Sequence, residues 1–315
     1  MLKRWGMLLL KLLVTAALLA LAMRKVDVSA AWAVGKTVTA PALGLSIGLM
    51  VIQVVICALR WRWVVMSLGG SIPSRTALSI YWIGNFFGLV LPGAVGGDAV
   101  RMWKTRQLGM PLGLSVNSVM LERLSTLFGL VLLVSATEPL LIDSLPVGAA
   151  VWLFPAISAV GALGVTCLCL VHHFPPAFHR WSVGRMVGSL AHHTRRLYLR
   201  PKHLARLALL VFVGLNNMSL SVYALAVGLG IPLSMTDCIV LIPPVILMTT
   251  LPLSVAGWGA RELAMVSMLG MVGVTEPQAL ALSVLFGLVT MVTALPGGLW
   301  WLLSADRRAM HPPQA

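Results

Sequence analysis

The chain has 315 residues, of which 59% are hydrophobic and only 10% charged, and its 23 Lys and Arg outnumber its 9 Asp and Glu. With a mean hydropathy of +0.94, this composition excludes a soluble globular protein and is typical of a membrane protein with several spans. The four cysteines all lie in apolar runs, in no grouping typical of a zinc site or of a disulfide framework.

Apolar windows of about 20 residues predict the membrane-spanning helices. The first window follows a basic N-terminal start, and we interpret it as a transmembrane helix rather than a removed signal peptide, since later spans anchor the chain in any case. We therefore expect an all-α integral membrane protein with a single polytopic domain. The six predicted full spans are residues 5–23, 41–59, 113–135, 148–171, 207–228 and 278–303.

Two further apolar segments, residues 76–103 and 237–273, are interrupted by Pro and Gly. The first contains LPGAVGGD and the second LPLSVAGWGARE. Broken backbone at membrane depth is tolerated only where it is buried in protein or lines a wet cavity. We expect each segment to form a re-entrant helical hairpin whose break faces the interior of the protein.

The positive-inside rule predicts the orientation of the chain. Lys and Arg gather at the N-terminus, after the second span, after the first broken segment, in residues 172–206 and near the C-terminus, whereas the opposite connections carry most of the acids. Both termini are therefore expected in the cytoplasm, with the first broken segment entering from the cytoplasm and the second from outside. The charges counted after the second span are Arg60, Arg62 and Arg75, and Trp61 beside them is typical of an interfacial belt.

Residues 172–206 carry seven Lys or Arg and six His among Phe, Trp, Met and Leu. This pattern predicts a basic cytoplasmic amphipathic loop that lies on anionic lipids. Because this charge is tied to a membrane face, we expect no nucleic-acid partner. The His pairs lack carboxylate or Cys partners at ligand spacing, so no metal site is expected.

The two broken segments resemble each other in sequence. At an offset of 160 residues, LPGAVGGDAVR and LPLSVAGWGAR share five identities, and at an offset of 158 LSTLFGLV and LSVLFGLV agree at seven of eight positions. Three full spans separate the copies, and an odd number of crossings turns the second copy over. We predict an inverted-topology repeat of approximately residues 76–135 and 237–303, an arrangement common in secondary transporters; chance similarity of leucine-rich helices is the alternative.

Charged side chains gather at both breaks and in the middle of the span that follows the first. A charge at the centre of a bilayer costs about 2.5 to 3.5 kcal/mol, so such residues usually face a pathway or a partner. Glycines at a break also free a helix N-terminus, which favours an anion such as phosphate. The predicted substrate-binding residues are Asn85, Pro92, Gly96, Gly97, Asp98, Arg101, Glu122, Arg123, Pro252, Gly257, Gly259, Arg261 and Glu262.

Structural alternatives exist for several of these residues. Arg101 could be only an interfacial anchor, and Asp98 only the N-cap of the following helix. Arg261 and its acidic neighbour could simply reach water on the outer face. Glu122 could be a structural partner of Arg101 or Arg261, and Asn85 a hydrogen-bond donor between helices.

Three stretches carry a family resemblance. These are N-x5-LPG-x2-GGD-x2-R at residues 85–101, ER at residues 122–123 and P-x-S-x2-G-x-G-x-RE at residues 252–262. Together they resemble the flippase-like transmembrane domain of the lysylphosphatidylglycerol synthase family, over essentially the whole chain. The second long motif is looser, with Ala256 where the family more often has Gly.

The resemblance implies translocation of a lipid between the leaflets of a bacterial cytoplasmic membrane. The substrates it implies are aminoacyl-phospholipids, polyprenyl phosphates or hopanoids, with no cofactor, and it leaves a homo-oligomer open. The sequence lacks the aminoacyl-transferase domain of the bifunctional members, so we do not expect this chain to synthesise its lipid.

Two other functions compete with a lipid translocase. A small-anion secondary transporter would share the inverted repeat. A membrane-embedded lipid-phosphate transferase usually shows paired acids for a metal, whereas the nine acids here include no DxD or DDxxD. No nucleophile has a base at recognisable spacing, so we predict that the chain is not an enzyme.

The flanking charges make the topology testable with single cysteines at the two breaks. Gly96→Cys should react with a membrane-impermeant maleimide from the cytoplasmic side, and Gly257→Cys from the outside. Labelling in intact and permeabilised cells measures this. Labelling of both positions from the same side would refute the inverted repeat.

Overall fold

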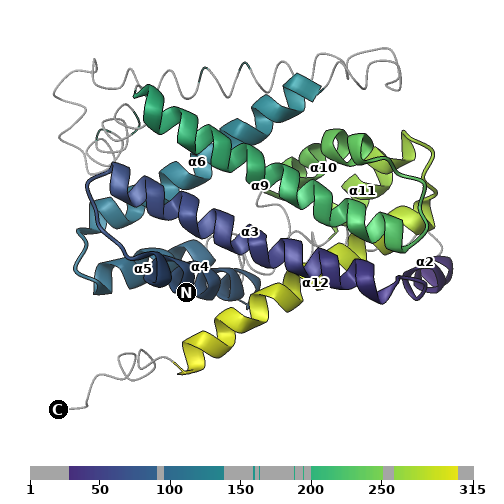
Figure 1. Cartoon of the computed structure of the whole chain (residues 1–315), viewed down its shortest axis with the longest axis horizontal. Coiled ribbons are helices and arrows are strands. Elements are labelled where there is room, and N and C mark those ends of the chain that lie inside the picture. The colour runs from purple at the N-terminus through teal and green to yellow at the C-terminus, as the bar shows by residue number, and fades with distance from the viewer. Residues whose placement is uncertain are drawn as a thin grey trace, which may run out of the picture.

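The computed structural model describes residues 28–90, 96–137, 200–250 and 259–303, together with four single residues between 159 and 194. Every regular element in these ranges is a helix (Figure 1), so the described chain is all-α as predicted. The helices are α2 (Val28–Gly35), α3 (Ala40–Ser67), α4 (Ser74–Val90), α5 (Gly96–Gln107), α6 (Leu112–Thr137), α9 (Pro201–Gly228), α10 (Met235–Thr250), α11 (Ala260–Gly270) and α12 (Glu276–Leu303).

Four described helices, α3, α6, α9 and α12, are long and apolar enough to cross a membrane. They coincide with four of the six predicted spans, and the chain is a multi-pass membrane protein. The spans predicted at 5–23 and 148–171 fall outside the described residues, apart from two single positions in the second.

Two of the spanning helices are longer than predicted. Helix α3 continues to Ser67 and α9 begins at Pro201, so Arg60 is not a loop residue and the basic loop predicted for 172–206 does not include residues 201–206. A hydropathy window stops at the first cluster of charges, whereas a helix stops where its backbone is interrupted. Here Gly69 interrupts α3 with a φ of 92°, a conformation that favours glycine.

Each of the two broken segments forms a pair of helices, α4 with α5 and α10 with α11. In the first pair Gly84 and Gly88 of α4 contact Arg101 and Gly97 of α5 respectively, so the two helices pack in opposite directions as a hairpin. The residues between the helices, 91–95 and 251–258, lie outside the described ranges and include Pro92, Pro252 and Gly257. That these hairpins re-enter the membrane remains a prediction.

The described helices form two series with the same order and similar lengths. Helices α3 to α6 have 28, 17, 12 and 26 residues, and α9 to α12 have 28, 16, 11 and 28. Gly69 after α3 and Gly230 after α9 both have positive φ, as do Gly109 after α5 and Gly273 after α11. Helices α3 and α9, which are first in their series, are therefore both followed by a glycine turn, and so are α5 and α11, which are third. The likeness extends to α3 and α9, beyond the segments matched by sequence.

Helices α3 and α9 lie side by side in opposite directions through the middle of the molecule (Figure 1). The backbone N–H of Thr39 at the start of α3 donates to the carbonyl oxygen of Gly228 at the end of α9, at 3.1 Å. Further along the pair, Asn217 of α9 donates to the side-chain oxygen of Gln53 at 3.0 Å. These hydrogen bonds between helices fix the register of the central pair.

Helix α12 packs against α4 through two adjacent glycines, which joins the second series to the first. A Cβ at Gly297 would overlap the backbone carbonyl oxygen of Trp82, and one at Gly298 would press on the Phe86 ring. Nearby, the indole N–H of Trp82 donates to the carbonyl oxygen of Thr293 at 2.7 Å. Small residues thus allow the two backbones to approach closely.

We expect Gly297→Ala to lower the thermal unfolding midpoint of the purified protein in detergent. The obstacle is a backbone carbonyl, which cannot rotate away as a side chain can, and overpacking of this kind costs about 1 to 3 kcal/mol. Gly48→Ala in α3 is the matched control, because a Cβ there meets nothing within 4 Å and Ala favours a helix. Equal midpoints for Gly297→Ala and the wild type would contradict the close approach.

Candidate functional site

The sequence GGD at the start of α5 sets how closely this helix approaches α4. A Cβ at Gly97 would overlap the carbonyl oxygen of Gly84, and one at Gly84 would lie 2.9 Å from Cγ of Arg101. The two glycines therefore let the stem of Arg101 lie flat against α4. Gly97 acts as a packing residue here, and a contact of Gly96 or Gly97 with substrate remains a prediction.

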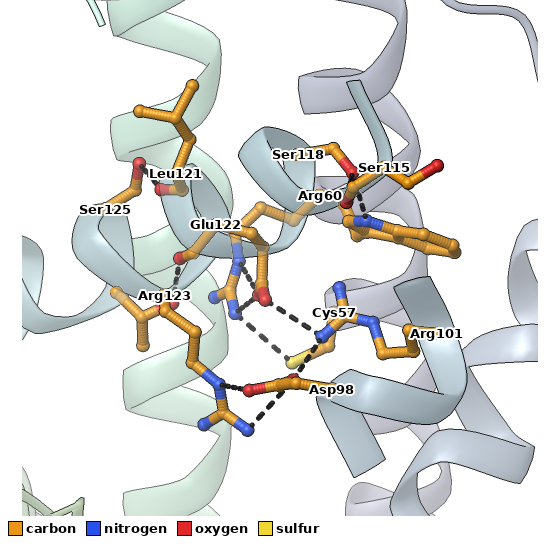
Figure 2. Close-up of polar contacts among 12 residues, drawn as sticks. Cys57, Arg60, Asp98, Arg101, Ser115, Ser118, Leu121, Glu122, Arg123 and Ser125 are labelled. Carbon is orange, nitrogen blue, oxygen red and sulfur yellow. Dashed lines mark hydrogen bonds and ion pairs between the residues drawn. The ribbon is translucent and has the colours of Figure 1, made fainter. Parts of the chain in front are cut away.

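Glu122 of α6 lies at the centre of a buried group of charges (Figure 2). Its Oε1 accepts from Nε of Arg60 at 3.0 Å and also from Nη2 of Arg60, while its Oε2 accepts from Nη1 of Arg101 at 3.2 Å. The side chains of all three residues are at most 4% exposed. Since removing a charge from water costs several kcal/mol, this pairing is what makes their burial tolerable.

Asp98 extends the same cluster to a third arginine. Its Oδ1 accepts from Nη1 of Arg101 at 3.3 Å, and its Oδ2 accepts from Nε of Arg123 at 2.8 Å. Glu122 and Arg123 are adjacent on α6, so their side chains point about 100° apart. Arg101 of α5 pairs with Glu122, and Asp98 of α5 pairs with Arg123 (Figure 2). We name these four residues, together with Arg60, the charge cluster. Three arginines and two carboxylates give it a net charge of +1.

The guanidinium group of Arg101 has one edge without a hydrogen-bond partner. Its carbon lies 4.6 Å from the ring centre of Trp61 and 4.4 Å from that of Tyr81, so the group lies against two neighbouring aromatic rings. Nη1 bonds both carboxylates, whereas the buried Nε and Nη2 have no partner among the residues that the structure describes. These two donors form the fork with which arginine binds a carboxylate or phosphate through parallel hydrogen bonds. Because unpaired buried donors are costly, this edge favours an anionic guest.

A smaller charged site lies in the second series. Nη2 of Arg261 donates to Oε1 of Glu262 at 2.7 Å, and Nε of Arg261 donates to the hydroxyl of Ser283 at 3.3 Å. The backbone N–H of Gly259, which has a φ of 84°, donates to the other oxygen of Glu262. The guanidinium lies directly on Gly287 of α12, where a Cβ would overlap it. Ser283 and Gly287 belong to LSVLFGLV, so that motif provides both a hydroxyl partner and space.

The structure brings the predicted charges into two groups. Asp98, Arg101, Glu122 and Arg123 meet in the charge cluster, and Arg261 pairs with the adjacent Glu262. Arg101 is buried rather than anchored at an interface, and Glu122 is its ion-pair partner, one of the alternatives that the sequence leaves open.

Three other predicted residues, Pro92, Pro252 and Gly257, lie outside the described residues, and Asn85 is half-buried on α4. The structure thus leaves the role of each of these four as a prediction.

Sequence reasoning missed Arg60 and the two rings around Arg101. The sequence places Arg60 after the second span and Trp61 in an interfacial belt, and both placements are wrong because α3 continues past these residues and buries them. Tyr81 had no signal beyond being a polar aromatic in an apolar segment. The sequence feature that could have placed Arg60 inside α3 is the Gly69–Gly70 pair, which marks the end of this helix about two turns after Arg60.

Residues 8–297 match the family model described as the lysylphosphatidylglycerol synthase TM region. The match includes both charged sites and nearly the whole chain. No curated protein matches the chain. Within the described ranges, no group of three or more His, Cys, Asp or Glu side chains lies close enough to hold a metal ion.

We expect Arg60→Gln to destabilise the protein by about 3 to 5 kcal/mol, because it leaves the buried Glu122 carboxylate with one fewer partner. Arg123→Gln is the comparison, for which we expect a smaller loss, since the Arg123 side chain is 52% exposed and the Asp98 carboxylate keeps its ion pair with Arg101. Denaturant unfolding in detergent measures both. Similar small losses for the two variants would show that Arg60 does not support the cluster.

Proposed function

Because the chain belongs to the family of the lysylphosphatidylglycerol synthase TM region, we propose that it is a lipid translocase that moves an anionic or phosphate-headgroup lipid across the bacterial cytoplasmic membrane. Membership of this family points to a role connected with membrane lipids. The substrate classes we propose are aminoacyl-phospholipids and polyprenyl phosphates. Hopanoids are less favoured, because they lack the phosphate that the site would bind.

The observation that carries this proposal is the edge of the Arg101 guanidinium whose two buried donors, Nε and Nη2, have no partner among the described residues. A phosphate diester has one negative charge and oxygens spaced to accept the two parallel N–H groups of an arginine fork. Bound there, it would neutralise the net charge of +1 on the charge cluster. Asp98 and Glu122 hold Nη1, so the phosphate would bind without displacing either carboxylate.

In the mechanism we propose, Arg101 and Arg261 receive the phosphate in turn while the lipid tails stay in the bilayer. Asp98, Glu122 and Glu262 keep these arginines oriented and partly neutralised when the site is empty, since an unpaired buried cation is costly. The charged headgroup would then meet an arginine in each half of the protein, and at Arg261 it would replace Ser283 or Glu262 as the partner of Nε or Nη2.

The arrangement of the two helix series supports an inverted repeat, and both termini in the cytoplasm would follow from it. Helices α3 and α9 are each the first helix of their series and have the same length. Both are apolar enough to span the membrane, and they run in opposite directions. Two copies related in this way would be turned over relative to each other. Arg101 and Arg261 would then lie on opposite sides of the membrane midplane.

A groove between α6 and α9 favours a lipid over a small anion as the transported molecule. It has a volume of about 210 Å³ and is lined almost wholly by apolar side chains, among them Phe128, Val211 and Phe212. Ser125 at its wall is one turn from Glu122 on α6. A transporter of small anions does not need an apolar groove beside its charges, whereas a lipid transporter needs one to hold the tails of its lipid.

We also propose that the chain moves its lipid without breaking a bond in it. Release of phosphate or of free headgroup by the purified protein, lost on Asp98→Asn, would overturn this part of the proposal. The same vesicles serve for both the transport and the hydrolysis measurement.

Transport of labelled phosphatidylglycerol and aminoacyl-phosphatidylglycerol in reconstituted liposomes, followed by headgroup accessibility, tests the mechanism. We expect Arg101→Lys to transport at least tenfold more slowly than the wild type, because a lysine cannot form the second parallel hydrogen bond and one charged bond contributes about 1.5 to 3 kcal/mol. Arg106→Lys is the control, since Arg106 is an exposed cation at the end of the same helix. Wild-type rates for both Arg101→Ala and Arg261→Ala would refute the mechanism.

A further inference from the structure

An open cavity with both polar and apolar walls lies at the end of the α4–α5 hairpin that is remote from the break between the two helices. Its volume is about 660 Å³, and its walls come from the first turns of α4, the last turns of α5 and the end of α12. This cavity is separate from the charge cluster and contains no residue of it. The polar and aromatic residues that line it are Arg75, Thr76, Ser79, Lys104, Gln107 and Trp300.

The chemistry of this cavity suits an anion attached to an apolar body. Arg75, two hydroxyl groups and an amide supply hydrogen-bond donors, the buried Lys104 adds a second positive charge, and none of the described lining residues is acidic. Ile80, Leu108 and Trp300 form an apolar rim beside these donors. A free inorganic ion would use only the donors, whereas a phospholipid headgroup with its glycerol and first methylenes would use both parts.

The position of the cavity fits the level of the cytoplasmic headgroups. Arg75 and Lys104 belong to the basic flanks of the α4–α5 segment, which predict the cytoplasmic side. Trp300 is 44% exposed near the end of α12, as expected of a tryptophan at a membrane interface. Anionic lipids are concentrated in this leaflet and attract basic residues.

The cavity also lies one helical turn from the charge cluster. Lys104 follows Arg101 by three residues on α5, a spacing that places two side chains on the same helix face. Ile80 directly precedes Tyr81, whose ring lies on the guanidinium of Arg101. The cavity thus lies about one helical turn along α5 from Arg101.

We propose that this cavity is a loading site, which binds the phosphate headgroup of a lipid from the cytoplasmic leaflet before the headgroup reaches Arg101. Its role in loading rests on the proposed translocase function. Binding of an anionic phospholipid in the cavity does not, and it can be measured on its own.

Bromine-labelled lipids provide a local readout, because bromine quenches the fluorescence of a nearby tryptophan. The full chain is placed in vesicles of brominated phosphatidylglycerol and phosphatidylcholine, and the signal of Trp300 is obtained by subtracting the signal of Trp300→Phe. The ratio of the quenching by the two lipids gives the preference for the anionic headgroup at the cavity. Inorganic phosphate, added as a competitor, distinguishes a lipid site from a site for the free ion.

Two variants change the cavity in different ways. Arg75→Gln removes an exposed cation, and Ser79→Phe fills the space without changing charge. We expect Arg75→Gln to reduce the preference for phosphatidylglycerol at Trp300 by about fivefold, the factor that corresponds to about 1 kcal/mol for one basic residue near an anionic lipid. Ser79→Phe should also reduce this preference, because the ring occupies the space of the headgroup. Arg106→Gln, an exposed cation on α5 outside the lining, should leave the preference unchanged.

An unchanged preference in both cavity variants would overturn the proposal, as would an equal loss in Arg106→Gln, which would indicate general surface charge. Abolition of the preference by millimolar inorganic phosphate would assign the cavity to the free ion instead. Translocation is scored separately in the same vesicles. A protein that prefers phosphatidylglycerol at Trp300 without moving it contradicts the proposed function alone, and one that moves it without this preference contradicts the loading site alone.

Discussion

The carboxylate of Glu122 holds Arg60 of α3 and Arg101 of α5 in the interior of a multi-pass membrane protein. Each charge would be costly to bury alone, so the three helices that carry them have to meet at this carboxylate. Glu122 takes one donor of Arg101 and Asp98 shares it, which leaves the opposite edge of the guanidinium without a partner among the described residues. The ion pairs that allow the cluster to be buried thus also determine which edge of Arg101 can receive an anion.

The two helix series have their long and short helices in the same order, but the charged residues at matching positions differ. At the offsets that align the motifs, Asp98 corresponds to Trp258, while Glu122 and Arg123 correspond to Leu280 and Ala281. The second series therefore pairs Arg261 with the adjacent Glu262 on α11 and with a hydroxyl of α12. This difference gives one half of the protein a charge-rich site and the other a compact one, so the two binding steps that we propose would differ in strength.

The parts of the fold that depend on local composition could be predicted from the sequence, and those that depend on contacts between distant segments could not. Apolar length placed α6 and α12 to within two residues at each end. The same method ended α3 too early, because a window scores Arg60 as a boundary while the helix buries it against Glu122. The charges that matter were identifiable as charges in an apolar context, and Asp98, Arg101 and Glu122 were all found in this way.

The pairing of those charges needed the three-dimensional structure. Sequence left Glu122 between Arg101 and Arg261, since it gives no measure of which helix lies nearer to α6. The similarity between α3 and α9 was also hidden, because their residues differ although their lengths and their glycine turns agree. Gly97 was taken for part of an anion site, and its close approach to Gly84 shows that it has a packing role in any case.

An experimental structure of the protein in lipid nanodiscs that contain phosphatidylglycerol would test the role of Arg101 most directly. Our interpretation predicts a phosphate whose oxygens lie about 3 Å from both Nε and Nη2 of Arg101, with Nη1 still bonded to Glu122 and Asp98. A structure in which these two donors bond to protein groups, with every lipid phosphate outside the helix bundle, would contradict it.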